Sequence, residues 1–136
     1  MEDLNQLKVY TVEEANRLIG RLTPLLEELR VKRDLIVTKE VEIDAQELIA
    51  GRADGGVSPA LDKKVEEYHR LVDRFYHVVD EIHSLGCLLK DVDMGLIDFY
   101  SMQQGKLVYL CWKLGEPEVR YRHEIGQGYT HREPLP

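Results

Sequence analysis

Several side chains that could do chemistry lie within residues 110–124, LCWKLGEPEVRYRHE. They comprise a thiol, an imidazole, a carboxylate and several cations: Cys111, Lys113, Glu116, Arg120, Arg122 and His123. Thiol and imidazole groups bind transition metals and serve as nucleophiles or general bases, and cationic side chains bind carboxylates and other anions. This segment is therefore the first candidate for a functional site.

The alternation of apolar and polar residues predicts that this segment is antiparallel β-sheet. Residues 95–102, 106–114 and 118–124 each have the pattern of a strand, and two-residue turns at 104–105 and 116–117 would join them. The sequence therefore predicts a three-stranded β-meander.

The two faces of this meander are expected to differ in chemistry, because side chains alternate across a strand. With two-residue turns, Trp112 faces Tyr121 on an apolar face that also holds His123. The opposite, polar face would carry Asp98, Cys111 and Arg122 in one row across the strands. We expect the apolar face to cover the helices.

His123 has two interpretations in this register. As the one titratable residue among apolar neighbours, it could be a metal ligand or a general base whose pKa falls on burial. We favour a buried structural histidine that hydrogen-bonds to a backbone carbonyl or to a carboxylate on a helix. Cys111 would lie on the other face, out of reach of His123, so we expect it to pack and not to act as a nucleophile.

Other polar groups resemble known sites only weakly. Residues 66–83 place several histidines and carboxylates at helical spacing, but no H-E-x-x-H or E-x-x-H pair occurs, so a solvated face is favoured. Asp91 and Asp93 lack the glycine and glutamate spacing of a calcium loop and fit a turn better. No phosphate-binding or nucleophile-elbow motif is present. The sequence predicts neither a metal nor a cofactor.

The tail GQGYTHREPLP, residues 126–136, is expected to run extended and to pack on its own domain or on a second subunit. Tyr129 and Leu135 would anchor it, and Arg132 would form a bidentate pair with a carboxylate. Anion binding by Arg132, beside Lys113 and Arg122, is the alternative.

The elements that position these residues begin with a helical hairpin over residues 11–86. Thr11 and Glu14 form a capping box, and Pro24 predicts a kink in the first helix. Ser58 begins a second helix whose apolar residues follow a coiled-coil spacing. A glycine-rich turn at 51–57 would join them, so the fold class is α+β: a coiled-coil-like antiparallel helical hairpin, a small three-stranded antiparallel β-meander and an extended C-terminal tail.

Size and charge limit the possible functions. A single domain over residues 1–136 is expected, comprising the hairpin (11–86), the meander (87–124) and the tail (125–136). The net charge of −7 disfavours nucleic acid and anionic membranes as partners. Neither a membrane span nor a leader is evident, and two cysteines without C-x-x-C spacing suggest reduced thiols. These features predict a cytoplasmic protein.

Four sequence blocks carry a resemblance that spans almost the whole chain. TVEEAN, GCLLKDVDMGLIDF, VYLCWKLGEPEVRYRHE and GYTHREPL occur in this order, and together they resemble an uncharacterised prokaryotic family, domain-of-unknown-function family 2203. Arg122 departs from the family pattern, which often has tryptophan there. The resemblance implies no reaction or substrate. It implies that the following residues occupy the motif positions of the family: Lys90, Asp91, Asp98, Lys113, Glu116, His123 and Arg132.

Two functional hypotheses follow from the sequence. The leading one is a homo-oligomer, expected to be a dimer, that serves as an interaction or scaffold module without catalysis, because the hairpin has more apolar surface than a small sheet can cover. The alternative is an enzyme that depends on a small molecule or a metal. Its ligand-binding residues would be Asp98, Lys113, Glu116, His123 and Arg132. The sequence names no small-molecule ligand.

Overall fold

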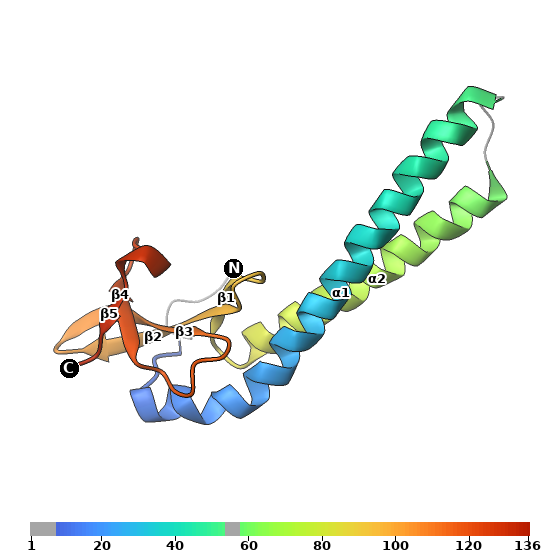
Figure 1. Ribbon diagram of the computed structural model, residues 1–136. Helices are drawn as coiled ribbons and strands as arrows, with labels where there is room; N and C mark the ends of the chain where they lie inside the picture. The colour runs from blue at the N-terminus through green and yellow to red at the C-terminus, as the bar shows by residue number, and fades with distance from the viewer. Residues whose placement is uncertain (1–7, 54–57) are drawn as a thin grey trace.

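The protein consists of two long helices followed by a five-stranded antiparallel sheet (Figure 1). This computed structural model describes residues 8–53 and 58–136, and the side chains of all of these except residues 50–53. The first turns of α1 and the last turns of α2 lie beside the sheet, and the rest of the helical hairpin extends away from it (Figure 1). The expected α+β class is therefore correct in outline.

The first helix, α1 (Val12–Ala53), begins at the capping box that the sequence predicts. The Thr11 backbone N–H donates to Glu14 Oε1 at 3.0 Å, and the Glu14 N–H donates to Thr11 Oγ1 at 3.1 Å. Pro24 lies inside the helix without ending it, and the hydroxyl of Thr23 donates to the carbonyl of Ile19. Figure 1 shows α1 bending between its first turns and the extended part, as expected for a proline within a helix.

The second helix, α2 (Pro59–Ser84), starts as expected at Ser58, whose hydroxyl accepts a hydrogen bond from the N–H of Leu61. Beyond Leu29 of α1 and before Val78 of α2, no side chain in the described part of the hairpin is buried. We call this outer part, residues 31–49 and 58–74, the arm. The predicted turn at 51–57 overlaps the end of α1, and its residues 54–57 lie outside the described residues.

The sheet has five strands, so the predicted three-stranded meander is a partial description. The strands follow the chain in the order β1-β2-β3-β4-β5, with bounds β1 (Leu88–Asp91), β2 (Leu96–Gln103), β3 (Lys106–Lys113), β4 (Tyr121–Glu124) and β5 (Glu133–Pro134). The two additional strands are short, and each pairs with only one neighbour. The tail is not simply extended, because Tyr129–His131 forms a 3-10 turn before β5 pairs with β4.

The register of the first predicted hairpin is confirmed. Ile97 pairs with Trp112 and Phe99 with Leu110. Gln104 and Gly105 both have positive φ values, 54° and 77°, which is the geometry of a two-residue turn whose twist suits antiparallel strands.

The register of the second predicted hairpin is wrong by one residue. Cys111, and not Trp112, pairs with Tyr121, and Tyr109 pairs with His123. The expected two-residue turn at 116–117 is instead a loop over residues 114–120, because β3 ends at Lys113 and β4 starts at Tyr121. A shift of one residue moves every side chain of a strand to the other face. His123 therefore lies on the same face as Asp98 and Cys111.

The core lies between the inner face of the sheet and the helices. Its fully buried side chains include Leu22, Leu26 and Leu29 of α1, Ile82 of α2, and Ile97, Phe99, Leu110 and Trp112 of the sheet. The inner face carries the apolar residues that the sequence assigns to it, apart from His123 and Tyr121. The outer face, away from the core, carries the polar groups described next.

Candidate functional site

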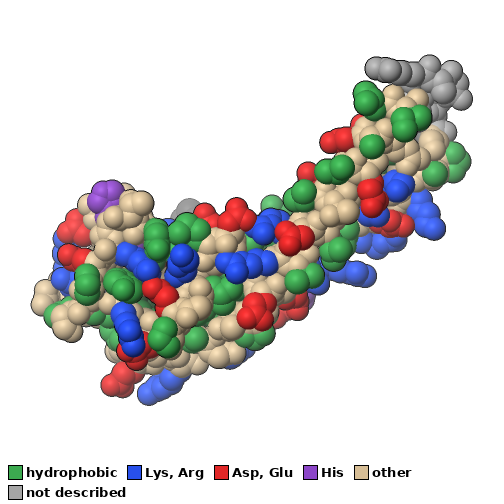
Figure 2. Space-filling view, in the orientation of Figure 1, with side chains coloured by type: hydrophobic (Ala, Val, Ile, Leu, Met, Phe, Trp, Pro, Cys, Tyr) green, Lys and Arg blue, Asp and Glu red, His purple; other side chains and the backbone are tan. Residues whose placement is uncertain are grey.

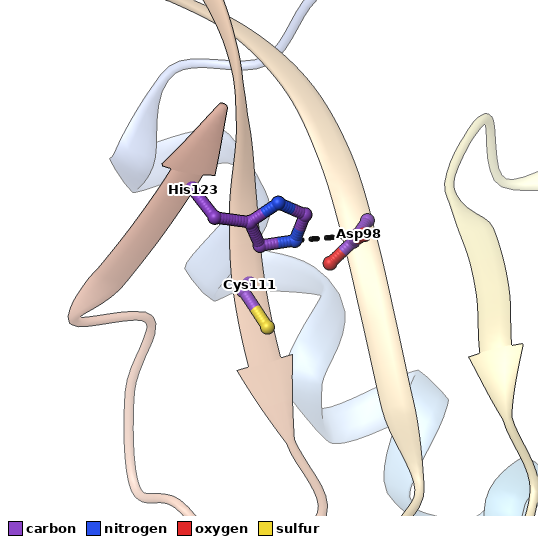
Figure 3. Close-up of side chains that lie close together, drawn as sticks. All are labelled: Asp98, Cys111 and His123. Atoms are coloured by element: carbon purple, nitrogen blue, oxygen red, sulfur yellow. Dashed lines mark hydrogen bonds and ion pairs between the residues drawn. The ribbon is translucent and has the colours of Figure 1, made fainter. Parts of the chain in front are cut away.

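Three buried polar side chains meet on the outer face of the sheet: Asp98 of β2, Cys111 of β3 and His123 of β4 (Figure 3). Asp98 pairs with Cys111 across β2 and β3. His123 lies two residues beyond Tyr121, the β4 partner of Cys111, and is opposite Tyr109. One carboxylate oxygen, the thiol sulfur and one imidazole nitrogen all lie within 4.8 Å of one another. We call these three residues the sheet cluster.

Both ring nitrogens of His123 have a partner. Nδ1 lies 3.1 Å from the backbone oxygen of Glu124, and Nε2 lies 3.1 Å from Oδ2 of Asp98. Because a carbonyl oxygen can only accept, Nδ1 carries a hydrogen and donates it. The expected buried histidine is thus partly correct: a backbone carbonyl is present, but the carboxylate comes from a strand and not from a helix.

Asp98 is a buried carboxyl group that is only partly satisfied. Its Oδ2 faces His123 and lies 3.9 Å from the ammonium of Lys90. Its Oδ1 is buried and has no hydrogen-bond partner at normal geometry among the described residues. Burial raises the pKa of Asp98, and the attraction of His123 and Lys90 offsets this rise only in part. The site therefore contains one buried acceptor atom, Asp98 Oδ1, that makes no hydrogen bond of normal geometry with the described residues.

Cys111 connects the sheet cluster to the tail. Its thiol interacts with Asp98 and with the guanidinium of Arg132. Burial raises the pKa of Cys111 to about 12, and the negative charge of Asp98 adds to the rise. As the protein stands, this thiol is protonated at neutral pH, and a protonated thiol is a poor nucleophile.

Arg132 forms the bidentate pair that the sequence predicts. Its two terminal nitrogens donate to Glu116 at 3.0 and 2.7 Å. Its guanidinium also lies 4.1 Å from the ring centre of Tyr121 and 4.4 Å from that of Tyr129. Leu135 anchors the tail as expected, because it packs against the core, and the centre of the Tyr129 ring lies 5.5 Å from the ammonium of Lys113. These contacts hold the tail over the outer face of the sheet.

The five residues predicted to bind a ligand form two pairs and one flanking cation. Asp98 pairs with His123, and Glu116 pairs with Arg132. Lys113 lies 5.5 Å from the ring centre of Tyr129. Cys111 is not among the five, because the expected register placed it away from His123, but the structure brings its sulfur within 4.8 Å of a ligand atom of both Asp98 and His123. Whether the loop between β3 and β4 has an odd or an even number of residues decides which face His123 occupies. Knowing that number would have placed Cys111 beside His123, but the local sequence does not fix it.

The remaining sequence candidates have structural roles or face solvent. Asp91 Oδ1 accepts from the N–H of Met94, which confirms the predicted turn. Arg122 pairs with Glu133 of β5 at 3.3 Å. The histidines and carboxylates on the polar flank of α2 are exposed, as expected. Within residues 8–53 and 58–136, the sheet cluster is the one group of three such side chains close enough to share a metal ion.

A second surface feature lies on the arm. Val31, Val41, Leu48 and Ile49 of α1 expose 61%, 63%, 65% and 75% of their surface. On the same helix, Lys39 and Glu40 bond to Glu67 and Tyr68 of α2, so the four apolar residues lie on the side turned away from α2. We call them the outward row. Figure 2 shows hydrophobic side chains exposed along the arm.

The comparisons with known proteins give a family and no activity. Among the described residues, no helix is both long enough and apolar enough to cross a bilayer. No curated protein and no solved structure matches the chain. A family model, described as an uncharacterized conserved protein (DUF2203), matches residues 8–135. Nearly the whole chain is covered, so this protein belongs to the DUF2203 family.

Proposed function

We propose that this protein is a homodimeric interaction module that self-associates through the outward row of α1. The observation that carries the proposal is the exposure of Val31, Val41, Leu48 and Ile49, each above 60%, on one side of a helix that extends beyond the core. Singly exposed apolar residues are normal on protein surfaces, but several highly exposed apolar residues on one side of a helix are typical of an interaction site.

The spacing of the outward row suits pairing with a second helix. Val41 and Leu48 are seven residues apart, and Val31 and Ile49 are separated by roughly five helical turns, so within each pair the side chains point in the same direction. Asp34 is the charged residue that interrupts this side of α1 between Val31 and Ile49. A mostly uncharged strip along an otherwise charged helix favours an apolar partner.

A second copy of this chain fits the row better than the other classes of partner do. A two-fold interface uses the same patch on both subunits, and an antiparallel pairing centred near residue 40 would bring Val31 of one copy to Ile49 of the other. The net charge of −7 disfavours nucleic acid and anionic membrane surfaces at the same place.

The chemistry of the thiols supports a binding role over a catalytic one. Cys87 and Cys111 are both unpaired and buried, and burial raises their pKa values to about 11 and about 12. Neither is an activated nucleophile in this state. Two free cysteines also favour a reducing compartment, and we infer that the protein acts in the cytoplasm.

Sedimentation velocity of the full chain at micromolar concentration tests the proposal. The wild type should sediment as a species of twice the 15.8 kDa chain mass. Val41→Glu combined with Leu48→Glu should sediment as a monomer, because each change places a carboxylate in the apolar interface. Both positions are exposed within the single chain, so the fold of the protomer should be retained, which circular dichroism checks.

The matched control makes the same chemical change at apolar positions away from the arm. Met102 and Ile125 expose 52% and 45% of their surface, and Met102→Glu combined with Ile125→Glu should leave the mass at that of a dimer. A monomeric wild type would overturn the proposal. So would a dimer that survives the two arm substitutions, because another surface would then hold it together.

A further inference from the structure

We propose that Asp98, Cys111 and His123 bind one transition metal ion of the zinc type. This inference does not depend on the self-association of the arm. It starts from the donor atoms of the sheet cluster: one carboxylate oxygen, one thiol sulfur and one imidazole nitrogen, all within 4.8 Å of one another. Three adjacent strands supply them, and the side chains lie close together, with His123 and Asp98 facing each other and the Cys111 sulfur beside them (Figure 3).

The spacing of the nitrogen and oxygen donors is close to that of a tetrahedral site, and the sulfur lies within 4.8 Å of each. Zinc bond lengths of about 2.0 Å to nitrogen or oxygen and about 2.3 Å to sulfur place neighbouring ligand atoms roughly 3.3 to 3.7 Å apart. The Nε2 to Oδ2 distance between His123 and Asp98 is 3.1 Å. The nitrogen and oxygen donors therefore need to shift by only a few tenths of an ångström, and rotation of the Cys111 side chain would bring the sulfur, which lies within 4.8 Å of both, to ligand distance.

The hydrogen bonding of His123 is that of a metal ligand. Its Nδ1–H donates to the backbone oxygen of Glu124, which fixes the ring and directs the lone pair of Nε2 toward Asp98. Histidine ligands of metals usually donate their other N–H to a carbonyl or a carboxylate in this way. Nε2 and Oδ2 are both acceptors by nature, so a proton or a metal ion must lie between them.

The second carboxylate oxygen supplies an independent observation. Asp98 Oδ1 is buried and makes no hydrogen bond of normal geometry with the described residues, although the Cys111 thiol interacts with the carboxylate, and the side chain exposes only 4% of its surface. An unpaired buried acceptor costs free energy that a bound cation would recover. Because Cys111 adds sulfur to the site, magnesium and calcium are poor candidates, and zinc or cobalt(II) suits the mixed donors.

Two cations border the site, and both are compatible with an ion. Lys90 lies 3.9 Å from Asp98 Oδ2, but its side chain is 41% exposed and can turn to solvent. Arg132 is held by Glu116 and interacts with the Cys111 sulfur, where it would favour the thiolate that a metal requires. A divalent ion, one carboxylate and one thiolate sum to zero charge. Three protein ligands leave a fourth position for water or another small ligand.

Cobalt(II) titration of the full chain, freed of metal with a chelator, tests the inference. The wild type should bind one ion per chain and show a thiolate-to-cobalt charge-transfer band in the near ultraviolet, together with the visible bands of tetrahedral cobalt. Zinc should displace the cobalt and abolish both sets of bands. Cys111→Ser should abolish the charge-transfer band, and His123→Gln should weaken binding by at least roughly 100-fold, more than loss of an outer-shell contact does.

Cys87→Ser is the matched control, because Cys87 is the other buried free thiol and lies outside the sheet cluster. This variant should keep the stoichiometry and the charge-transfer band. His77→Gln removes an exposed histidine of α2 and should also have no effect. A wild type without the charge-transfer band would overturn the inference. So would a band that Cys111→Ser leaves intact, or cobalt binding that His77→Gln reduces as much as His123→Gln does.

Discussion

Arg132 donates two hydrogen bonds to Glu116 and stacks on the ring of Tyr121. Through these contacts, a residue of the tail is fixed to the loop that follows β3 and to a side chain of β4. The side chains of Arg132 and Glu116 expose only 12% and 20% of their surface. This pair holds the tail beside Cys111, and its removal should affect stability more than removal of an exposed ion pair.

Arg132→Lys should lower the free energy of unfolding by about 1–2 kcal/mol, because an ammonium cannot form the two parallel hydrogen bonds or the stacked contact. Urea denaturation at neutral pH measures this loss. Arg120→Lys is the control, since Arg120 and its partner Glu118 are both more than half exposed. That change should alter stability by less than about 0.5 kcal/mol. Equal effects of the two changes would contradict the structural role of Arg132.

The Glu116 carboxylate should make stability depend on pH. Burial raises its pKa, but hydrogen bonds from Arg132 and from the Lys113 backbone outweigh this, so the net pKa lies below the ordinary value. A carboxyl group whose pKa is lowered by folding stabilises the protein above its unfolded pKa, and this contribution is lost as pH falls through the folded pKa. The stability advantage of the wild type over Glu116→Gln should therefore shrink between about pH 5 and pH 3. A constant difference across that range would refute the assignment.

In the metal-free protein, Asp98→Asn should leave the free energy of unfolding at neutral pH unchanged or raise it by up to about 1 kcal/mol. The side-chain amide of asparagine can donate to the Nε2 of His123. The change also removes a carboxylate whose charged form is disfavoured by burial, as the raised pKa of Asp98 indicates. Asp98→Ala should instead destabilise by about 1–3 kcal/mol, because Nε2 is then left without a partner. Thermal melts in the presence of a chelator compare the two. A strongly destabilised Asp98→Asn would indicate that the carboxylate is a structural requirement.

Gly95 should tolerate no larger residue. Its φ is 66°, and a Cβ there would lie 2.6 Å from the Cβ of Leu114. Gly95→Ala should cost about 2–4 kcal/mol through the clash and the strained backbone. Gly105 has a similar φ of 77° but no atom near its Cβ position, so Gly105→Ala should cost only about 1–2 kcal/mol. Chemical denaturation of both variants separates steric from conformational cost, and equal losses would contradict the close approach of Leu114.

The elements that the sequence predicts well are those fixed by local chemistry. The Thr11 and Glu14 cap, the Ser58 cap and the tight turn at Gln104 and Gly105 each depend on residues within a few positions of one another. The side chains of the two caps satisfy nearby backbone groups, and glycine readily adopts the positive φ that the turn needs, so the local sequence specifies all three. The bidentate pair of Arg132 was also predicted, although its partner Glu116 could not be named.

The register of β4 could not be predicted, because distant contacts set it. The N–H of Val119 donates to Asn16 Oδ1, 103 positions earlier, at 2.6 Å, and Trp112 Nε1 donates to the carbonyl of Glu116. These bonds shape the loop over residues 114–120, and the length of that loop decides which face His123 occupies. The sheet cluster is thus a product of tertiary structure. Strands β1 and β5 were not predicted, because each is short and pairs with only one neighbour, and neither LLKD nor EP alternates apolar and polar residues.

The continuity of α1 sets a distance between the two proposed interactions. The same helix packs Leu22, Leu26 and Leu29 under the sheet and carries Leu48 near its far end. If two copies meet antiparallel around residue 40, about 11 residues of helix separate that point from Leu29, the nearest core residue of α1, in each copy, which is roughly 17 Å. The cores of the two copies would then begin about 33 Å apart along the paired helices. The two metal centres would therefore be too far apart to share one ion or one small ligand.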